Sequence, residues 1–90
     1  MIRKVFVKNS LGLHARPAAM ITRMAGKAEK TIWIVDGEKR ADASSVIDIL
    51  TLNAGKGTSL SIETESENDI DVLNDLAKFF ESGFGEDGDG

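Results

Sequence analysis

The sequence has no cysteine, and its 90 residues include one histidine, one proline and one tryptophan. Without cysteine the chain can form neither a disulfide framework nor a thiolate metal site, and a single histidine argues against zinc. We therefore expect no metal and no cofactor. No apolar run approaches the ~18 residues of a membrane span, and no signal-peptide pattern is visible. We accordingly expect a cytoplasmic protein without membrane insertion.

The charge balance is acidic and uneven along the chain. Eleven basic and 15 acidic residues give a net charge of −4, which speaks against a general nucleic-acid binder. Lysines and arginines gather before position 31, whereas acids dominate after Glu63. The length suits one domain, which we place at residues 1–82. Residues 83–90 are rich in glycine and acids, and we predict a disordered tail there.

Hydrophobic periodicity predicts four strands and three helices. The strands are expected at residues 2–8, 31–35, 38–42 and 59–65, and the helices at residues 15–27, 46–52 and 70–80. The order β-α-β-β-α-β-α favours an α+β fold, an open-faced β-sandwich. In it a mainly antiparallel four-stranded sheet would carry three helices on one face.

One stretch holds both the only histidine and the only proline: Gly12-Leu13-His14-Ala15-Arg16-Pro17-Ala18-Ala19. His14 falls at a strand-to-helix turn, and Pro17 suits the first turn of the helix that follows. The free N–H groups of that turn and the positive end of the helix dipole favour an anion. Arg16 adds a charged planar donor. An imidazole at such a place can accept a phosphoryl group, and the helix start at Ala15, Arg16 and Pro17 can then hold the phosphate.

The simpler interpretation of a lone histidine near a helix start is a cap or a surface residue. Two features favour a functional site instead. Gly12 can take backbone angles that other residues resist, so it allows a tight turn beneath His14. A second helix start follows at Ser44 and Ser45, either of which is a natural N-cap, with Asp48 in the first turn.

The helix predicted at residues 46–52 is apolar nearly all round. A two-turn surface helix buries one side, so the other side should form an exposed apolar docking patch. The alternative is a helix buried on both sides. Trp33 is interpreted as a packing residue, and Met20 and Met24 as core fillers.

The residues from Gly12 to Ala18 resemble the active-site motif of HPr, the histidine-containing phosphocarrier of the bacterial phosphotransferase system. Residues 45–52, followed by Gly55-Lys56-Gly57, resemble the regulatory-serine helix of that family and its following loop. The interval between the two motifs matches without a gap. The resemblance covers about residues 2–80.

The resemblance implies a role for each matched residue. His14 would accept phosphate on Nδ1 from enzyme I, which takes it from phosphoenolpyruvate, and pass it to IIA domains of sugar transporters. Arg16 would assist the transfer. Ser45 would be the serine phosphorylated by HPr kinase/phosphorylase, although Ser44 leaves the modified position open. Three apolar residues of the helix would dock both partners: Val46, Ile47 and Leu50.

The resemblance therefore implies a phosphoryl-carrier protein in sugar transport, a substrate of other enzymes with no turnover of its own. We take a monomer as the default oligomeric state. Two alternatives remain. A regulatory or nitrogen-branch paralogue would have the same fold and the same His14. A plain interaction module would use the apolar helix as its dock and His14 as a cap. Asp48 departs from the family pattern because it places an acid in the docking helix, and the acidic tail extends beyond the usual end.

Overall fold

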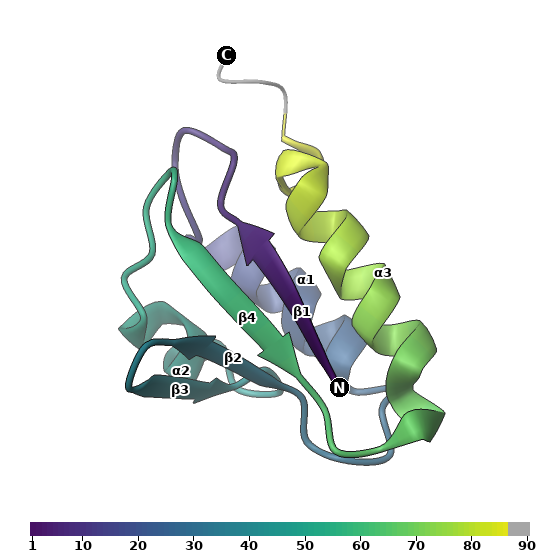
Figure 1. The fold of residues 1–90 in the computed structure, drawn as a ribbon. Helices are drawn as coiled ribbons and strands as arrows, with labels where there is room; N and C mark the ends of the chain where they lie inside the picture. Colours follow the sequence, from purple (N-terminus) through teal and green to yellow (C-terminus); the bar gives the residue numbers. More distant parts are fainter. Residues whose placement is uncertain (87–90) are drawn as a thin grey trace.

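The fold is taken from a computed structural model, which describes residues 1–86 (Figure 1). It confirms the predicted order of strands and α-helices and adds two short 3-10 helices, η1 and η2. The elements are β1 (Ile2–Phe6), α1 (Ala15–Ala25), β2 (Trp33–Asp36), β3 (Lys39–Asp42), α2 (Val46–Thr51), β4 (Ser59–Glu63), η1 (Glu67–Asp69), α3 (Ile70–Glu81) and η2 (Gly83–Gly85).

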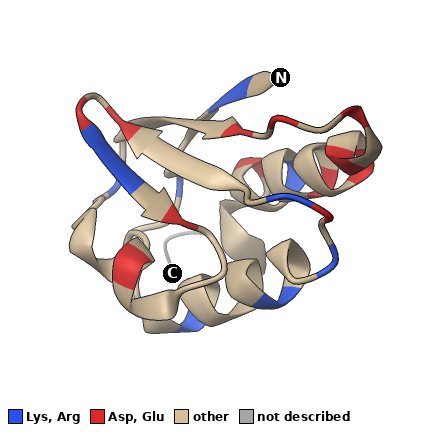
Figure 2. Ribbon diagram, turned by 90° about the horizontal axis from the view of Figure 1, so that it is seen from below, with Lys and Arg blue, Asp and Glu red and all other residues tan. Residues whose placement is uncertain are grey.

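The four strands form one antiparallel sheet in the order β1-β4-β2-β3. The central strand β4 pairs with β1 on one side, where Val5 lies opposite Leu60, and with β2 on the other, where Ile34 lies opposite Ile62. All three α-helices lie on one face of this sheet, as the view from below shows (Figure 2). The predicted open-faced α+β architecture is confirmed.

Alternation along the strands directs one face of the sheet into the core. Leu60 and Ile62, predicted to share a face, are both buried, as are Val5 and Ile34. Removing such side chains from water is the main driving force for a domain of this size. The sheet thus forms a fixed platform on which α1, α2 and α3 rest.

The helices bury one stripe each, with one departure from the sequence prediction. Ile21 of α1 and Phe80 of α3 are fully buried, and Met24 packs partly buried against the core. Met20, by contrast, remains 37% exposed. The prediction of Met20 as a core filler is therefore wrong, because its place on α1 lies at the edge of the buried stripe, facing solvent.

The start of the predicted tail is ordered. Phe84 is only 3% exposed, and its ring centroid lies 5.2 Å from that of Phe79 and 4.9 Å from that of Phe80. Such tilted and edge-on arrangements suit aromatic pairs. Residues 83–86 therefore pack against the domain, contrary to the predicted boundary after residue 82. The remainder of the predicted tail, residues 87–90, lies outside the described residues.

A buried carboxylate joins the loop after α1 to the start of α3. Asp69 is 1% exposed, and its two oxygens accept the backbone N–H groups of Glu29 at 2.7 Å and Lys30 at 2.9 Å. Charge-assisted bonds of this kind offset the cost of burying the carboxylate.

Between residues 1 and 86, no helix is both long and apolar enough to cross a membrane.

Replacement of Phe84 by alanine tests whether residues 83–86 belong to the domain. We expect Phe84→Ala to lower the free energy of unfolding by about 3 kcal/mol, because it leaves a cavity beside Phe79 and Phe80. Urea unfolding gives the measurement. Phe6→Ala is the matched control, since Phe6 is 46% exposed and its loss should cost much less. Equal losses for the two variants would contradict the assignment of Phe84 to the core.

Candidate functional site

His14 lies at the junction between the loop after β1 and the first turn of α1. It is the N-cap residue of α1, with extended backbone angles (φ −87°, ψ −173°), and its carbonyl accepts the Ala18 N–H at 3.1 Å. Its side chain makes no cap hydrogen bond and is 31% exposed. The helix thus fixes the backbone of His14 while the imidazole remains accessible at its N-terminus.

Gly12 holds this loop against the loop that follows α2. Its φ is +72°, and a Cβ added there would lie 2.7 Å from the Ala54 carbonyl oxygen and 3.0 Å from Gly55 Cα. The adjacent Leu13 N–H donates to that same Ala54 oxygen at 2.9 Å. The tight turn predicted at Gly12 is therefore present, and it requires glycine both for its angles and for space.

The first turn of α1 is suited to an anion. Pro17 is buried in that turn, where its missing N–H has no intrahelical role, and Ala15 and Arg16 are exposed. The only charged side chains of α1 are basic, Arg16 and Arg23 (Figure 2). Free N–H groups, the helix dipole and a guanidinium at one place favour negative charge.

A carboxylate that the sequence analysis missed also contacts His14. Glu86 Oε2 lies 2.6 Å from His14 Nε2, while Glu86 Oε1 accepts the Asn9 Nδ2–H at 2.6 Å. The hydrogen bond from Asn9, together with the hydrogen bond and charge of His14 and the charge of Arg16, lowers the pKa of Glu86 below its usual value against the opposing effect of desolvation. The one signal in the sequence that this segment packs near His14 was an aromatic residue, Phe84, inside an otherwise polar tail.

The second predicted site lies at the start of α2. Ser45 is the N-cap, and its Oγ accepts the Asp48 N–H at 3.2 Å. Ser44 is exposed and donates its hydroxyl to Asp42 Oδ1 at 2.6 Å. Of the two serines, Ser45 is therefore the cap. The Asp48 side chain accepts the backbone N–H of Asp42 at 3.3 Å, so it supports the turn before α2.

The predicted docking helix presents an apolar surface that is only partly free. Ile47 is 74% and Leu50 39% exposed, whereas Val46 is half-buried and packs against the core. Two further exposed apolar residues, Leu11 and Met20, come from the loop before His14 and from α1, which is a neighbour of α2. The sequence analysis missed both, because neither belongs to the helix that carried the pattern.

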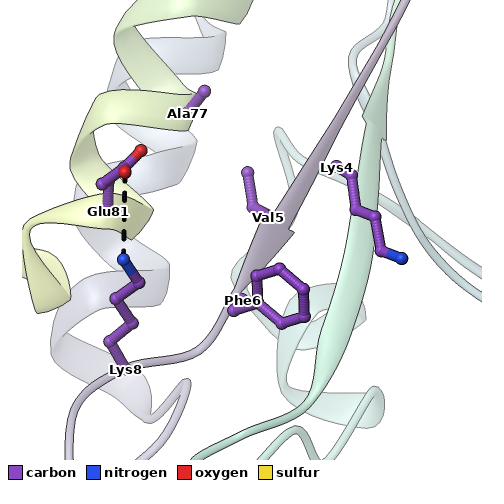
Figure 3. A pocket seen from close by; sticks show the side chains of 6 residues that line it. All are labelled: Lys4, Val5, Phe6, Lys8, Ala77 and Glu81. Atoms are coloured by element: carbon purple, nitrogen blue, oxygen red, sulfur yellow. Dashed lines mark ion pairs between the residues drawn. The ribbon is translucent and has the colours of Figure 1, made fainter.

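A shallow depression beside β1 does not include His14 or Ser45. A depression of about 280 Å³ between β1 and α3 is lined by Lys4, Val5, Phe6, Lys8, Ala77 and Glu81 (Figure 3). An exposed ion pair, Lys8 Nζ to Glu81 Oε1 at 3.8 Å, spans its edge. His14 and Ser45 do not line this depression. This depression is therefore separate from His14 and Ser45.

Substitution of Gly12 tests the contact between the two loops. Gly12→Ala should lower the free energy of unfolding by more than about 2 kcal/mol, because it adds a clash with backbone to the strain of a positive φ. Gly37→Ala is the control: Gly37 also has a positive φ (+60°), but a Cβ there meets nothing within 4 Å. Urea unfolding of both variants separates strain from clash. Equal destabilisation would show that the close approach has no energetic weight.

Comparisons with known proteins agree with this geometry. Residues 2–82 match the family model described as "PTS HPr component phosphorylation site". The chain is 30% identical over 87 residues to the phosphocarrier protein HPr of Treponema pallidum, covering 97% of this chain and 99% of that protein. It is 35% identical over 86 residues to the phosphocarrier protein NPr of Proteus mirabilis, covering 94% and 96%.

A solved structure is similar over nearly its whole length. The crystal structure of HPr-C-His from Thermoanaerobacter tengcongensis has a TM-score of 0.89 and 31% identity, with 97% of this chain and 98% of that chain covered. Sequence, fold and the placement of the motif residues thus point the same way. The chain belongs to the HPr family of phosphocarrier proteins of the phosphotransferase system.

Proposed function

We propose that His14 is the phosphoryl acceptor, which takes phosphate from a phosphohistidine of enzyme I and passes it to IIA domains. One observation carries this proposal: the partly exposed imidazole is held at the N-terminus of α1. In this role the chain is a substrate of its partners and has no turnover of its own.

The surroundings of His14 support transfer through Nδ1. Nε2 is already engaged with Glu86, which leaves Nδ1 for the incoming phosphorus. A loose transition state needs in-line approach and stabilisation of charge on the equatorial oxygens. The N–H groups at Ala15 and Arg16, and the Arg16 guanidinium, would supply that stabilisation. It is moderate, so the phosphate remains transferable.

The exposed residues near His14 support protein partners. Ile47 and Leu50 offer exposed apolar area, and the basic residues of α1 offer charge complementary to an acidic face. Val46 contributes less than the two others because it packs partly into the core. We assign partner docking to these residues of α2 together with the start of α1.

Ser45 is the proposed site of regulatory phosphorylation by HPr kinase/phosphorylase. A phosphate there would sit at the N-terminus of α2, where the helix dipole tolerates it. It would add roughly −1.5 to −2 charges beside Ile47 and Leu50. Inhibition would then arise by repulsion from an acidic partner face without a change of fold.

A nitrogen-branch carrier is the second candidate function. The observation in its favour is the 35% identity to the NPr protein of Proteus mirabilis, which matches the 34% identity to the HPr protein of Pseudomonas aeruginosa. The two functions share His14 and differ in partners. Transfer from His14 to a sugar-transporter IIA domain, compared with a nitrogen-branch IIA domain, distinguishes them.

Mass spectrometry after incubation with enzyme I, Mg²⁺ and phosphoenolpyruvate tests the carrier role. We expect one acid-labile phosphate on the wild type and none on His14→Ala, because the chain has no second histidine. Urea unfolding of the variant verifies that it is folded. Absence of phosphate from the wild type, with an active enzyme I control, would favour a plain interaction module instead.

An acidic substitution of Ser45 tests the proposed regulation. Ser45→Asp should slow phosphorylation of His14 by enzyme I roughly tenfold, since a like charge lowers the association rate. Aspartate is itself a good N-cap, so stability should be preserved. Ser44→Asp is the matched control, one residue outside the cap. A full rate for Ser45→Asp would refute repulsion as the regulatory mechanism.

A further inference from the structure

The carboxylate of Glu86 bridges two side chains of the His14 loop. Its Oε2 lies 2.6 Å from His14 Nε2, and its Oε1 lies 2.6 Å from Asn9 Nδ2. Asn9 is 3% exposed, and its Nδ2 also donates to the Gly12 carbonyl oxygen at 2.8 Å. A hydrogen-bonded chain thus runs from the Gly12 turn through Asn9 and Glu86 to the imidazole.

The direction of each bond in this chain is fixed by chemistry. Both atoms facing Asn9 Nδ2, the Gly12 carbonyl oxygen and Glu86 Oε1, are acceptors, so that end of the amide must be the NH₂ group. The amide keeps this orientation although its buried Oδ1 has no hydrogen-bond partner within residues 1–86. The Asn9 side chain therefore donates hydrogen bonds to both partners and cannot turn its oxygen toward them.

Glu86 is held in place by the segment that precedes it. Phe84 is buried against Phe79 and Phe80, the Gly85 N–H donates to Ser82 Oγ at 3.2 Å, and the Glu86 N–H donates to the Gly83 carbonyl oxygen at 3.1 Å. The carboxylate is thus delivered to His14 by an anchored turn. Glu86 also lies beyond residues 2–82, the part of the chain that matches the family model.

The contact selects one tautomer of the imidazole. An ionised carboxylate only accepts hydrogen bonds, whereas a neutral imidazole has one donor and one acceptor nitrogen. The nitrogen that faces Glu86 must therefore carry the proton. Nε2 is protonated, and Nδ1 keeps its lone pair.

We propose that Glu86 is a positioning residue for phosphoryl transfer, which holds His14 in the tautomer whose Nδ1 is free to attack. The inference rests on the proposed function of His14. The Nδ1 lone pair forms a bond to the phosphorus of the donor's phosphohistidine. The donor's N–P bond breaks, and its electron pair returns to the donor imidazole. Nε2 keeps its proton, and Glu86 faces the positive charge that the ring gains.

Substitution of Glu86 by glutamine gives the sharpest test, because it preserves shape and reverses one contact. Asn9 would still donate, so the new carbonyl oxygen would face Asn9 and the new NH₂ group would face His14 Nε2. That NH₂ group would favour protonation at Nδ1, the nucleophilic atom. A comparable reversal of an orienting carboxylate impairs histidine in other sites. Glu86→Ala only removes the contact, so it should be the milder variant.

Two measurements on wild type, Glu86→Gln and Glu86→Ala test the inference. The ¹⁵N chemical shifts of the single imidazole, taken at about pH 8.5 where an ordinary histidine is neutral, report the tautomer. The rate of phosphorylation by enzyme I reports the function. We expect Glu86→Gln to shift the tautomer toward Nδ1–H and to slow phosphorylation by about 10- to 100-fold, with a smaller effect for Glu86→Ala.

Glu81→Gln is the matched control, since Glu81 lies on α3 in an exposed ion pair with Lys8, a contact that involves neither His14 nor Asn9 (Figure 3). It should leave tautomer and rate unchanged. The inference would be overturned if Glu86→Gln left the tautomer or the phosphorylation rate unaltered, or if Glu86→Gln and Glu86→Ala slowed phosphorylation equally. In those cases a phosphorylated wild type would still support the proposed function. A wild type that takes no phosphate would overturn the proposed function, and the inference with it.

Discussion

The close approach between the Gly12 turn and the backbone at Ala54 is the constraint on which the rest of the site depends. It leaves no room for a Cβ at Gly12, and it is closed by the Leu13 N–H donating to the Ala54 oxygen at 2.9 Å. The loop before α1 and the loop after α2 are thereby fixed to one another. His14 and the exposed apolar residues of α2 consequently share one rigid frame.

A carrier must hold a phosphate without trapping it, and the geometry around His14 suits that requirement. The helix N-terminus and Arg16 favour negative charge beside an imidazole that is 31% exposed, and solvent weakens each interaction there. Glu86 occupies Nε2 of the imidazole, so this contact leaves the other ring nitrogen, Nδ1, unengaged. The balance differs from that of a closed phosphate pocket, which would bind more tightly and release more slowly.

The parts of the site that could be predicted are those that depend on residues close together in the sequence. Gly12, His14 and Pro17 lie within one turn, so strand, turn and helix start could be inferred from local rules. An N-cap at Ser44 or Ser45 was predicted for the same reason, and the structure shows that it is Ser45. Glu86 could not be predicted, because it is 72 residues from His14 and reaches it only after Phe84 has packed on α3. The prediction that Met20 fills the core was wrong for a different reason. Periodicity identifies the buried face of a helix but does not show where the edge of that face lies.

The contacts of Phe84 with the core and of Glu86 with the imidazole also explain why the acidic, glycine-rich segment 83–86 is ordered. Composition alone favours disorder at residues 83–86, since few side chains there can be buried. Phe84 supplies one aromatic ring for Phe79 and Phe80, and Glu86 supplies charge for Asn9 and His14. The two residues act at opposite ends of one short turn. Apolar burial holds the segment, and the held segment places a carboxylate where local sequence around His14 offers none.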